Sequence, residues 1–323
     1  MATVAATAPP PAQARKLAIW RDGDQIAHLV TLLFAASVFV VTVYLVYQLW
    51  IHSGPSRAKF GFGFLTGRTW DPVAENFGAL PFIYGTVLTS VLALVISVPL
   101  GVGAAIFLSE LAPPKLSNTC TFLVELLAAV PSVILGLLAI FTLVPIMRQY
   151  VEPFLKATLG DLPLFQGPAY GVGYLTAGVI LAIMTFPFII SISREALLAV
   201  PREQREAALA LGATKWESTW QVVVPFARLG IIGSVFLALA RALGETMAVT
   251  MVIGNDTGIH ASLLSPGYTI AAIIANEFTE ATGDVYLSSL VELGLVLFAV
   301  TMVLNGAAQL LIIATTRKGS RRD

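Results

Sequence analysis

Six long apolar runs constrain this chain more than any other feature of its sequence. They occupy residues 27–50, 82–109, 120–147, 173–192, 229–253 and 285–315. Each is at least as long as the roughly 20 residues that an α-helix needs to cross the hydrocarbon core of a bilayer. None alternates strictly between apolar and polar residues over ten positions, as a lipid-facing strand of a β-barrel does. The runs therefore predict an all-α integral membrane protein with six transmembrane helices.

The composition supports a membrane protein and excludes several other classes. Hydrophobic residues make up 57% of the chain and charged residues 12%, which is about half the charged fraction of a soluble globular domain. The 19 Lys and Arg residues balance the 19 Asp and Glu residues, so the chain lacks the basic excess with which nucleic-acid binders displace counterions. Cys120 is the one cysteine, which excludes an internal disulfide framework and a cysteine-cluster metal site.

The sequence also lacks the short motifs of common catalytic sites. It has no GxxxxGK[ST] loop, so the chain does not bind ATP through a P-loop. It has no GxSxG elbow and no HExxH helix, the motifs of two large hydrolase classes. We therefore expect no catalytic residue, no cofactor site and no metal site, and a role in transport rather than in covalent chemistry.

Basic residues predict the orientation of the chain. With six spans and a cytoplasmic N-terminus, thirteen of the 19 Lys and Arg residues fall in cytoplasmic segments and five in outer segments. Such an excess marks the cytoplasmic side, so both termini are predicted to be cytoplasmic. Residues 1–25 begin with an Ala- and Pro-rich stretch and are predicted to form a disordered arm. The first apolar run has full spanning length, which indicates an uncleaved anchor rather than a signal peptide.

The longest cytoplasmic segment, at about 193–228, carries a distinctive pattern. The run REAALALGA favours a helix by propensity, and Gly212 can end that helix in a left-handed conformation. A second helix is predicted from about Lys215 to Val223, before Pro225. The segment is either an ordinary amphipathic connector between two spans or a docking element for a cytoplasmic partner.

Four charged residues lie inside the apolar runs: Glu125, Arg241, Glu245 and Glu292. A charge there costs at least ~2.5–3.5 kcal/mol. Arg241 and Glu245 are four positions apart, which places them on one face of a continuous helix. They form either an ion pair that eases insertion or a binding point for an anion, because a guanidinium offers a planar fork of donors to oxygens. Thr246 adds a hydroxyl to this candidate pathway, whereas Glu125 and Glu292 lie near span ends and are predicted to be structural.

The cytoplasmic segment resembles the EAA motif of ABC importer permeases, EAA-x3-G-x9-I-x-LP. The matching residues are Glu206, Ala207, Ala208, Gly212 and Pro225, with valines at 222 and 224 in place of the usual isoleucine and leucine. The resemblance implies a type I ABC importer permease (MetI-like) fold, with a permease domain over 26–323, its core at about 76–316, and a coupling segment at 201–225. It also implies that this segment inserts into a groove on a separate ATPase subunit, which would bind the ATP.

Three further stretches resemble the PstC-type permeases of phosphate ABC importers. They are FLTGRTWDPVAENFGALPFIYGT at 64–86, RALGETMAVTMVIGN at 241–255 and TIAAIIANEFTEA at 269–281. The resemblance implies a subunit of the bacterial plasma (inner) membrane that imports inorganic phosphate by alternating access, with Arg241 and Glu245 on its pathway. It also implies three partners: a PstA-like permease, a PstB-like ATPase dimer and a PstS-like phosphate-binding protein. The alternatives are a permease for another oxyanion (sulfate, molybdate or phosphonate) and a stand-alone secondary transporter or channel.

Overall fold

The computed structural model describes the backbone of residues 11–319 and the side chains of residues 25–310. Within this part, six helices are long and apolar enough to cross a membrane. They are Gln25–His52, Leu80–Leu111, Ser132–Leu159, Tyr174–Leu198, Lys215–Gly244 and Asp284–Leu310. The predicted all-α membrane fold with six spans is confirmed. The chain divides into two compact units, Met1–His52 and Ser53–Asp323.

The first unit contains one long helix, α1 (Pro11–His52). Of the arm predicted over 1–25, residues 1–10 lie outside the described residues, and α1 begins directly after them. Within the apolar part, the hydroxyls of Thr31, Ser37 and Thr42 donate to backbone carbonyls three or four positions earlier. These polar side chains are therefore satisfied inside the helix, as hydrocarbon surroundings require.

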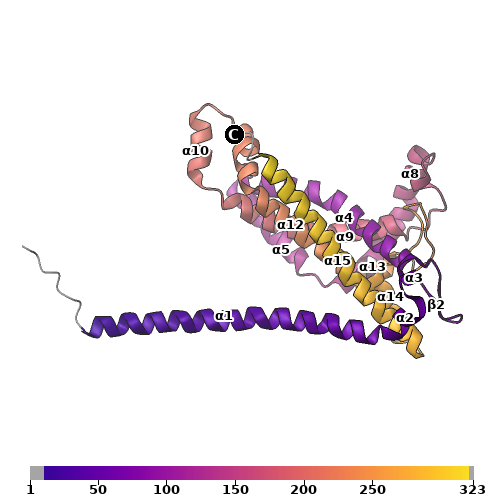
Figure 1. The fold of residues 1–323 in the computed structure, drawn as a ribbon. Helices are drawn as coiled ribbons and strands as arrows, with labels where there is room; N and C mark the ends of the chain where they lie inside the picture. The colour runs from indigo at the N-terminus through magenta and orange to yellow at the C-terminus, as the bar shows by residue number, and fades with distance from the viewer. Residues whose placement is uncertain (1–10, 320–323) are drawn as a thin grey trace, which may run out of the picture. The chain divides into compact units, whose positions relative to one another are not determined.

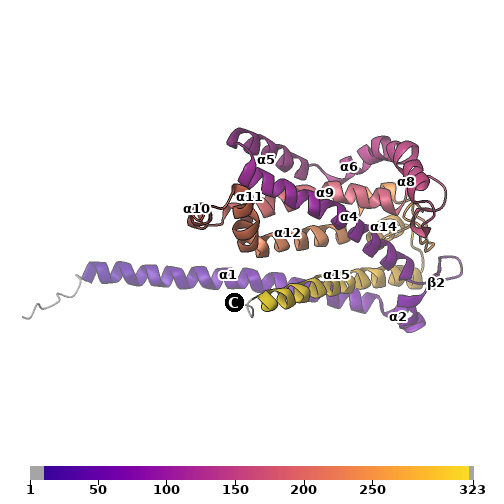
Figure 2. The same cartoon turned by 90° about the horizontal axis from the view of Figure 1, so that it is seen from above.

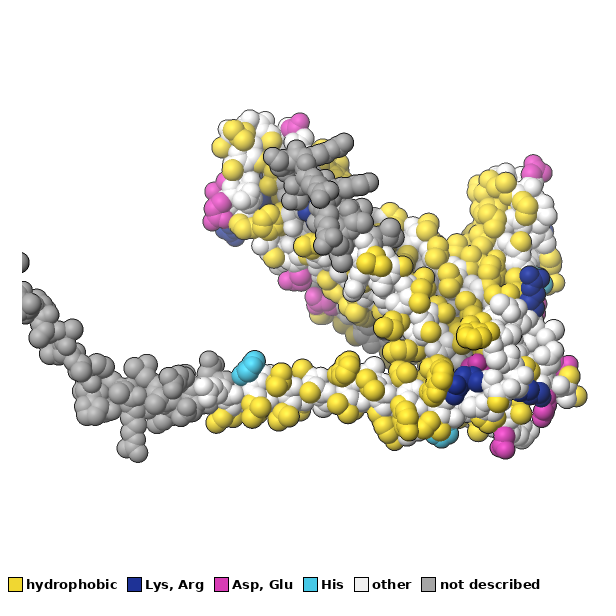
Figure 3. Space-filling view, viewed as in Figure 1, with side chains coloured by type: hydrophobic (Ala, Val, Ile, Leu, Met, Phe, Trp, Pro, Cys, Tyr) yellow, Lys and Arg dark blue, Asp and Glu magenta, His cyan; other side chains and the backbone are white. Residues whose placement is uncertain are grey.

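The second unit is built around α4 (Leu80–Ile106), α9 (Tyr174–Leu198) and α12 (Val224–Gly244), which run alongside one another (Figures 1 and 2). Helix α10 (Arg202–Ala210) lies at one end, which we call the α10 end. Helix α14 (Ile270–Glu277) lies toward the other, which we call the α14 end. The face in Figure 3 is covered largely by hydrophobic side chains, and most visible charged groups of this unit lie toward the two ends. Charges at the two ends and apolar side chains between them are typical of a membrane unit whose middle faces lipid or other apolar helices.

The remaining elements of this unit are short, apart from the last helix. Before α4 come α2 (Gly54–Phe60), α3 (Gly63–Thr66) and the antiparallel pair β1 (Trp70–Asp71) and β2 (Asn76–Phe77). After α4 come a π turn, η1 (Phe107–Leu111), and α5 (Pro114–Ala128). The chain ends with α15 (Asp284–Gly319).

The third span differs from the prediction of one helix over 120–147. Helix α5 stops at Ala128, and a new helix starts at Ser132, directly after Pro131. Pro131 is extended (φ −59°, ψ 139°), and a proline has no N–H to continue the ladder of α5. The spanning helix consists of α6 (Ser132–Leu138), η2 (Ala139–Leu143), α7 (Val144–Ile146), η3 (Met147–Val151) and α8 (Glu152–Leu159). A 3₁₀ turn, η4 (Pro163–Phe165), follows it.

The fifth span also differs, because it starts earlier and ends earlier than the predicted 229–253. It is continuous through α11 (Lys215–Ser218), the π turn η5 (Thr219–Val223) and α12. The prediction of a separate helix ending before Pro225 is wrong: Pro225 occupies the first turn of α12, where its missing N–H is accommodated by the π turn before it. After Gly244 the helix breaks, and α13 (Met247–Val252) follows.

Helices α9 and α12 approach each other through small residues. A Cβ added to Gly230 of α12 would lie 2.3 Å from the Cβ of Ala196 on α9. One turn further along α12, the hydroxyls of Ser234 and Ser193 form a buried hydrogen bond of 2.8 Å. Small side chains and hydroxyl pairs of this kind are how membrane helices pack without a hydrophobic driving force.

An aromatic cluster holds the α14 end together. The indole Nε1 of Trp70 and the hydroxyl of Tyr286 both donate to Oε2 of Glu277, each at 2.7 Å. The ring of Phe77 stacks on that of Tyr286 with centroids 5.2 Å apart. The β1–β2 pair is therefore fixed to both α14 and α15 by one carboxylate and the rings around it.

Candidate functional site

The break in the fifth span separates the two charges that were predicted to share a helix face. Helix α12 contains Arg241 and ends at Gly244. Glu245 is extended (φ −71°, ψ 129°), and Thr246 precedes the first residue of α13. The prediction that both charges lie on one continuous helix is wrong, because the chain leaves the helical path between them.

Arg241 lies against an aromatic ring of the neighbouring span. Its guanidinium carbon is 4.7 Å from the ring centroid of Phe188 on α9. Among residues 25–310, it forms no ion pair with a carboxylate, and its buried Nε has no hydrogen-bond partner there. The intrahelical ion pair is therefore not the arrangement found. A permanent cation with an unused donor remains inside a span, supported by a cation–π contact worth about 0.5–2 kcal/mol.

Glu245 and Thr246 turn toward their own backbone. Oε1 of Glu245 accepts a hydrogen bond from the N–H of Ala248 at 3.4 Å, so the carboxylate satisfies one of the first donors of α13. The Thr246 hydroxyl donates to the Gly244 carbonyl at 3.3 Å. The side chains of Arg241, Glu245 and Thr246 are only partly buried. The break thus presents a guanidinium and a carboxylate that are not neutralised by each other, an arrangement suited to an oxyanion that also carries a proton.

The segment with the EAA pattern forms a hairpin of α10 and α11 at the α10 end. Gly212 has φ +90°, so the predicted left-handed end of the first helix is confirmed. A capping box then starts α11: the Thr214 hydroxyl accepts from the Glu217 N–H at 3.2 Å, and the Glu217 carboxylate accepts from the Thr214 N–H at 2.8 Å. Both features fix the turn by local chemistry.

The hairpin exposes the residues of the EAA pattern. Glu206 and Ala207 are exposed on α10, as are Gly212 in the turn and Pro225 at the start of α12, whereas Ala208 is half-buried. Ala207, Ala208 and Gly212 line a cavity of about 540 Å³ inside the hairpin. Leu211, which also lines it, is 91% exposed. The hairpin therefore offers a concave surface that combines small residues with polar side chains such as Gln204 and Glu217.

One helix connects the two regions. The span Lys215–Gly244 starts in the hairpin and ends at the break beside Arg241. At 1.5 Å per residue it measures about 45 Å. The structure thus does not bring the residues predicted for coupling and for the pathway together in space: residues 206–212 precede the start of this helix, and Arg241 lies in its last turn.

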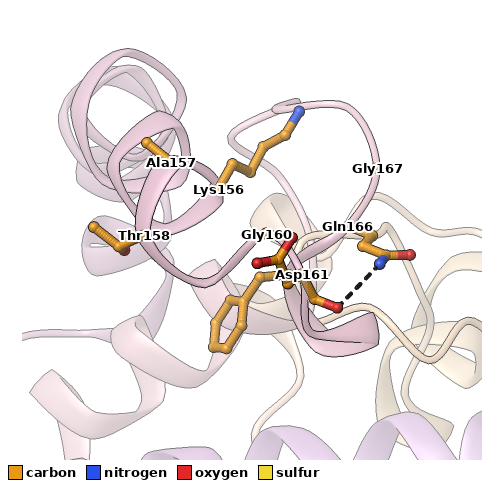
Figure 4. Close-up of a pocket in the computed structure, with 8 residues that line it drawn as sticks. Lys156, Ala157, Thr158, Gly160, Asp161, Gln166 and Gly167 are labelled. Atoms are coloured by element: carbon orange, nitrogen blue, oxygen red, sulfur yellow. Dashed lines mark hydrogen bonds between the residues drawn. The ribbon is translucent and has the colours of Figure 1, made fainter.

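Another cavity lies at the α14 end, on and after α8. It has a volume of about 350 Å³ and is lined by polar and small residues of 156–167 together with Phe165 (Figure 4). In Figure 4 the Lys156 side chain points away from Asp161, and Gln166 Nε2 donates to the Asp161 carbonyl at 3.5 Å. None of the predicted site residues lines this cavity.

Sequence reasoning missed Phe188 as part of the site. A phenylalanine inside an apolar run carries no signal that distinguishes a cation–π partner from a residue that faces lipid.

Of the two charges predicted to be structural, Glu125 is exposed on α5, and Glu292 is buried beside Ser56 and Arg57 of α2.

Comparisons with known proteins agree on the family. The family of the "Binding-protein-dependent transport system inner membrane component" matches residues 97–315. The chain is 48% identical over 294 residues to the phosphate transport system permease protein PstC of Mesorhizobium japonicum, covering 90% of each chain. It is 36% identical over 283 residues to a probable PstC of Methanocaldococcus jannaschii, covering 86% of this chain and 90% of the relative.

A solved structure shares the fold. The crystal structure of a bacterial ABC transporter involved in the import of the acidic polysaccharide alginate contains a chain that superposes with a TM-score of 0.57, at 16% identity, over 90% of this chain and 98% of that one. Together with six spanning helices, the family match and the relatives identify a multi-pass inner-membrane component of a binding-protein-dependent transport system. The chain belongs to the binding-protein-dependent inner-membrane transport components and, among them, to the PstC-type permeases.

Proposed function

We propose that the chain is the permease subunit through which an ATP-driven importer takes up inorganic phosphate. The substrate is inferred from the relatives named as phosphate transport permeases, which match over nine tenths of the chain. The observation that carries the proposed pathway is Arg241, a cation inside a span with a buried donor that no described residue uses. A fixed charge with free donors at a helix break is what a dehydrated oxyanion requires.

The chemistry of the break favours phosphate over fully ionised oxyanions. The N–H edge of the Arg241 guanidinium would bind two phosphate oxygens, while the Phe188 ring supports the guanidinium. The Glu245 carboxylate accepts only one weak hydrogen bond, so it can accept another from a protonated phosphate oxygen. Sulfate carries no proton at neutral pH and would meet the carboxylate as a like charge, which discriminates against it.

The partners are part of the proposal. The chain would pair with a PstA-like permease, receive phosphate from a PstS-like binding protein at the α14 end, and bind a PstB-like ATPase dimer at the α10 end. That dimer would hold the ATP, and the exposed Glu206 and small residues of the hairpin would form its contact. The α10 end would then be cytoplasmic. Because α10 lies between the fourth and fifth of six spans, the chain before the first span and after the sixth would be on the same side. ATP-driven movement of the hairpin would pass through α12 and switch access to Arg241.

Uptake by the reconstituted complex tests this function. We expect ATP-driven uptake of labelled phosphate into proteoliposomes, inhibited by excess arsenate and not by sulfate or molybdate. Arg241→Gln should lower uptake at least about tenfold, since a bond to a charged partner contributes about 1.5–3 kcal/mol. Arg228→Gln is the matched control, because Arg228 is an exposed arginine of the same helix. Unchanged uptake by an assembled Arg241→Gln complex would refute the pathway, and equal inhibition by sulfate would refute phosphate selectivity.

A further inference from the structure

The guanidinium of Arg205 joins three elements at the α10 end. Arg205 belongs to α10, and its Nε and Nη2 donate to the two carboxylate oxygens of Glu110 at 3.1 and 2.8 Å. Glu110 lies in η1, the π turn that extends α4. Nη1 donates to the carbonyl of Val200, and Nη2 also donates to the carbonyl of Leu197 at 2.7 Å. These two carbonyls lie at the C-terminal end of α9 and just beyond it.

Each of these contacts is of a strong kind. A bidentate pair of arginine and carboxylate combines charge with a fixed geometry. The last carbonyls of a helix have no partner inside the helix, and a cation at that end is favoured by the helix dipole. The side chains are only 21% (Arg205) and 11% (Glu110) exposed, so water screens the pair less than it screens a surface ion pair.

Helix α10 contributes no buried side chain to the apolar packing at this end. All nine residues of α10 are described, and none of their side chains is buried. The apolar cluster beneath the hairpin consists of residues from α4, α9, the turn after α9, η5 and α12: Ala105, Ile106, Leu197, Val200, Val223 and Ala227. It contains no residue of α10. The orientation of α10 relative to the spans therefore depends on its two turns, on its partly exposed contacts with α11 and η5, and on Arg205.

We propose that Arg205 is a positioning residue that latches α10 to the ends of α4 and α9, so that movement of α10 moves both spans. Helix α9 also carries Phe188, which lies nine positions before Leu197, about 13 Å along the axis, and contacts Arg241. The latch thus gives the hairpin a second route to the break, through α9, beside the direct route along α12. This inference rests on the proposed function, because it takes α10 as the element that an ATPase moves.

The number of phosphate ions imported per ATP hydrolysed is the readout that a merely structural residue would not change. In the reconstituted complex with all partner subunits, we expect Arg205→Ala to lower this ratio about tenfold while ATP hydrolysis continues. Glu110→Ala should lower it less, because the bonds of Arg205 to α9 remain. The double variant should match Arg205→Ala, since side chains that share one interaction are not additive. Arg202→Ala is the matched control: Arg202 is an exposed arginine in the first turn of the same helix.

An unchanged ratio in an assembled Arg205→Ala complex, or fully additive effects, would overturn the latch. If the Arg205→Ala complex does not assemble, Arg205→Lys replaces it, because lysine keeps the charge and loses the planar fork. The ratio should again fall, and an unchanged ratio would overturn the latch. Amide hydrogen exchange of α10 is a second test that does not depend on transport. Arg205→Ala should speed exchange across α10, and Arg202→Ala should leave it unchanged. Equal exchange rates in the two variants would overturn the latch. A wild-type complex that imports no phosphate counts against the proposed function, and the exchange measurement still decides the latch.

Discussion

Replacing Phe188 by leucine removes the ring on which the Arg241 guanidinium rests, at 4.7 Å from its centroid, and leaves an apolar side chain that suits the same position of α9. A cation–π contact contributes about 0.5–1 kcal/mol at an exposed site and about 2 kcal/mol when desolvated. Arg241 is partly buried with a fully buried Nε, so we take about 1–2 kcal/mol. This corresponds to a 5–30-fold fall in the equilibrium constant for stacking of the guanidinium on the ring, at 1.36 kcal/mol per tenfold.

We therefore expect Phe188→Leu to lower the rate of ATP-driven phosphate uptake by up to about 30-fold in the reconstituted complex, with assembly and basal ATP hydrolysis preserved. Phe188→Tyr keeps the ring and should retain most of the rate. Phe186→Leu is the matched control, because Phe186 is an aromatic residue of the same helix and lines an apolar cavity with residues of α4, and Arg241 does not line that cavity. If Phe188→Leu transports like the wild type, or if Phe186→Leu is equally impaired, the ring does not position the arginine and the reasoning is refuted.

Two predictions concern stability, measured as the thermal unfolding midpoint of the purified complex. Gly230→Ala should lower the midpoint, because the added Cβ would lie 2.3 Å from an alanine of α9 and overpacking costs about 1–3 kcal/mol. Gly233→Ala is the control and should leave the midpoint unchanged, because there is open space around Gly233. Equal midpoints for the two variants would contradict the close approach of α9 and α12 at Gly230. Glu277→Ala should also lower the midpoint, because it orphans two donors at 2.7 Å at a cost of about 1–3 kcal/mol each. The control here is Glu280→Ala, an exposed neighbour, and an unchanged Glu277→Ala midpoint would argue against the shared carboxylate.

The number of spans was predictable from the sequence because it depends on the length of apolar runs, which hydropathy measures directly. The breaks were not. Around Glu245 the residues remain apolar on both sides, so a helix that stops at Gly244 and restarts at Met247 has the same composition as one that continues. Pro225 led to the opposite error: it predicted a helix end, but the helix continues through Pro225 because a π turn precedes it.

The candidate site was predictable only in part, for a related reason. Arg241 was identifiable from the cost of a charge inside a span. Its partner was not, because Phe188 is brought to it by the packing of α9 on α12. Gly212 was predictable since a left-handed helix end is a local property. Arg205 was not, because Glu110 is 95 positions away.

The carboxylate at the α14 end has a consequence for how the chain is made. Trp70 and the Glu277 that accepts from its indole are 207 positions apart. At a synthesis rate of about 5–20 residues per second, the indole therefore waits roughly 10–40 s for its acceptor. During that time four further spans are synthesised, from α4 to α12. The β1–β2 pair can therefore be fixed to α14 only after 277 of the 323 residues have been synthesised. A chain truncated before Glu277 contains five of the six spans and has no carboxylate to accept from the Trp70 indole.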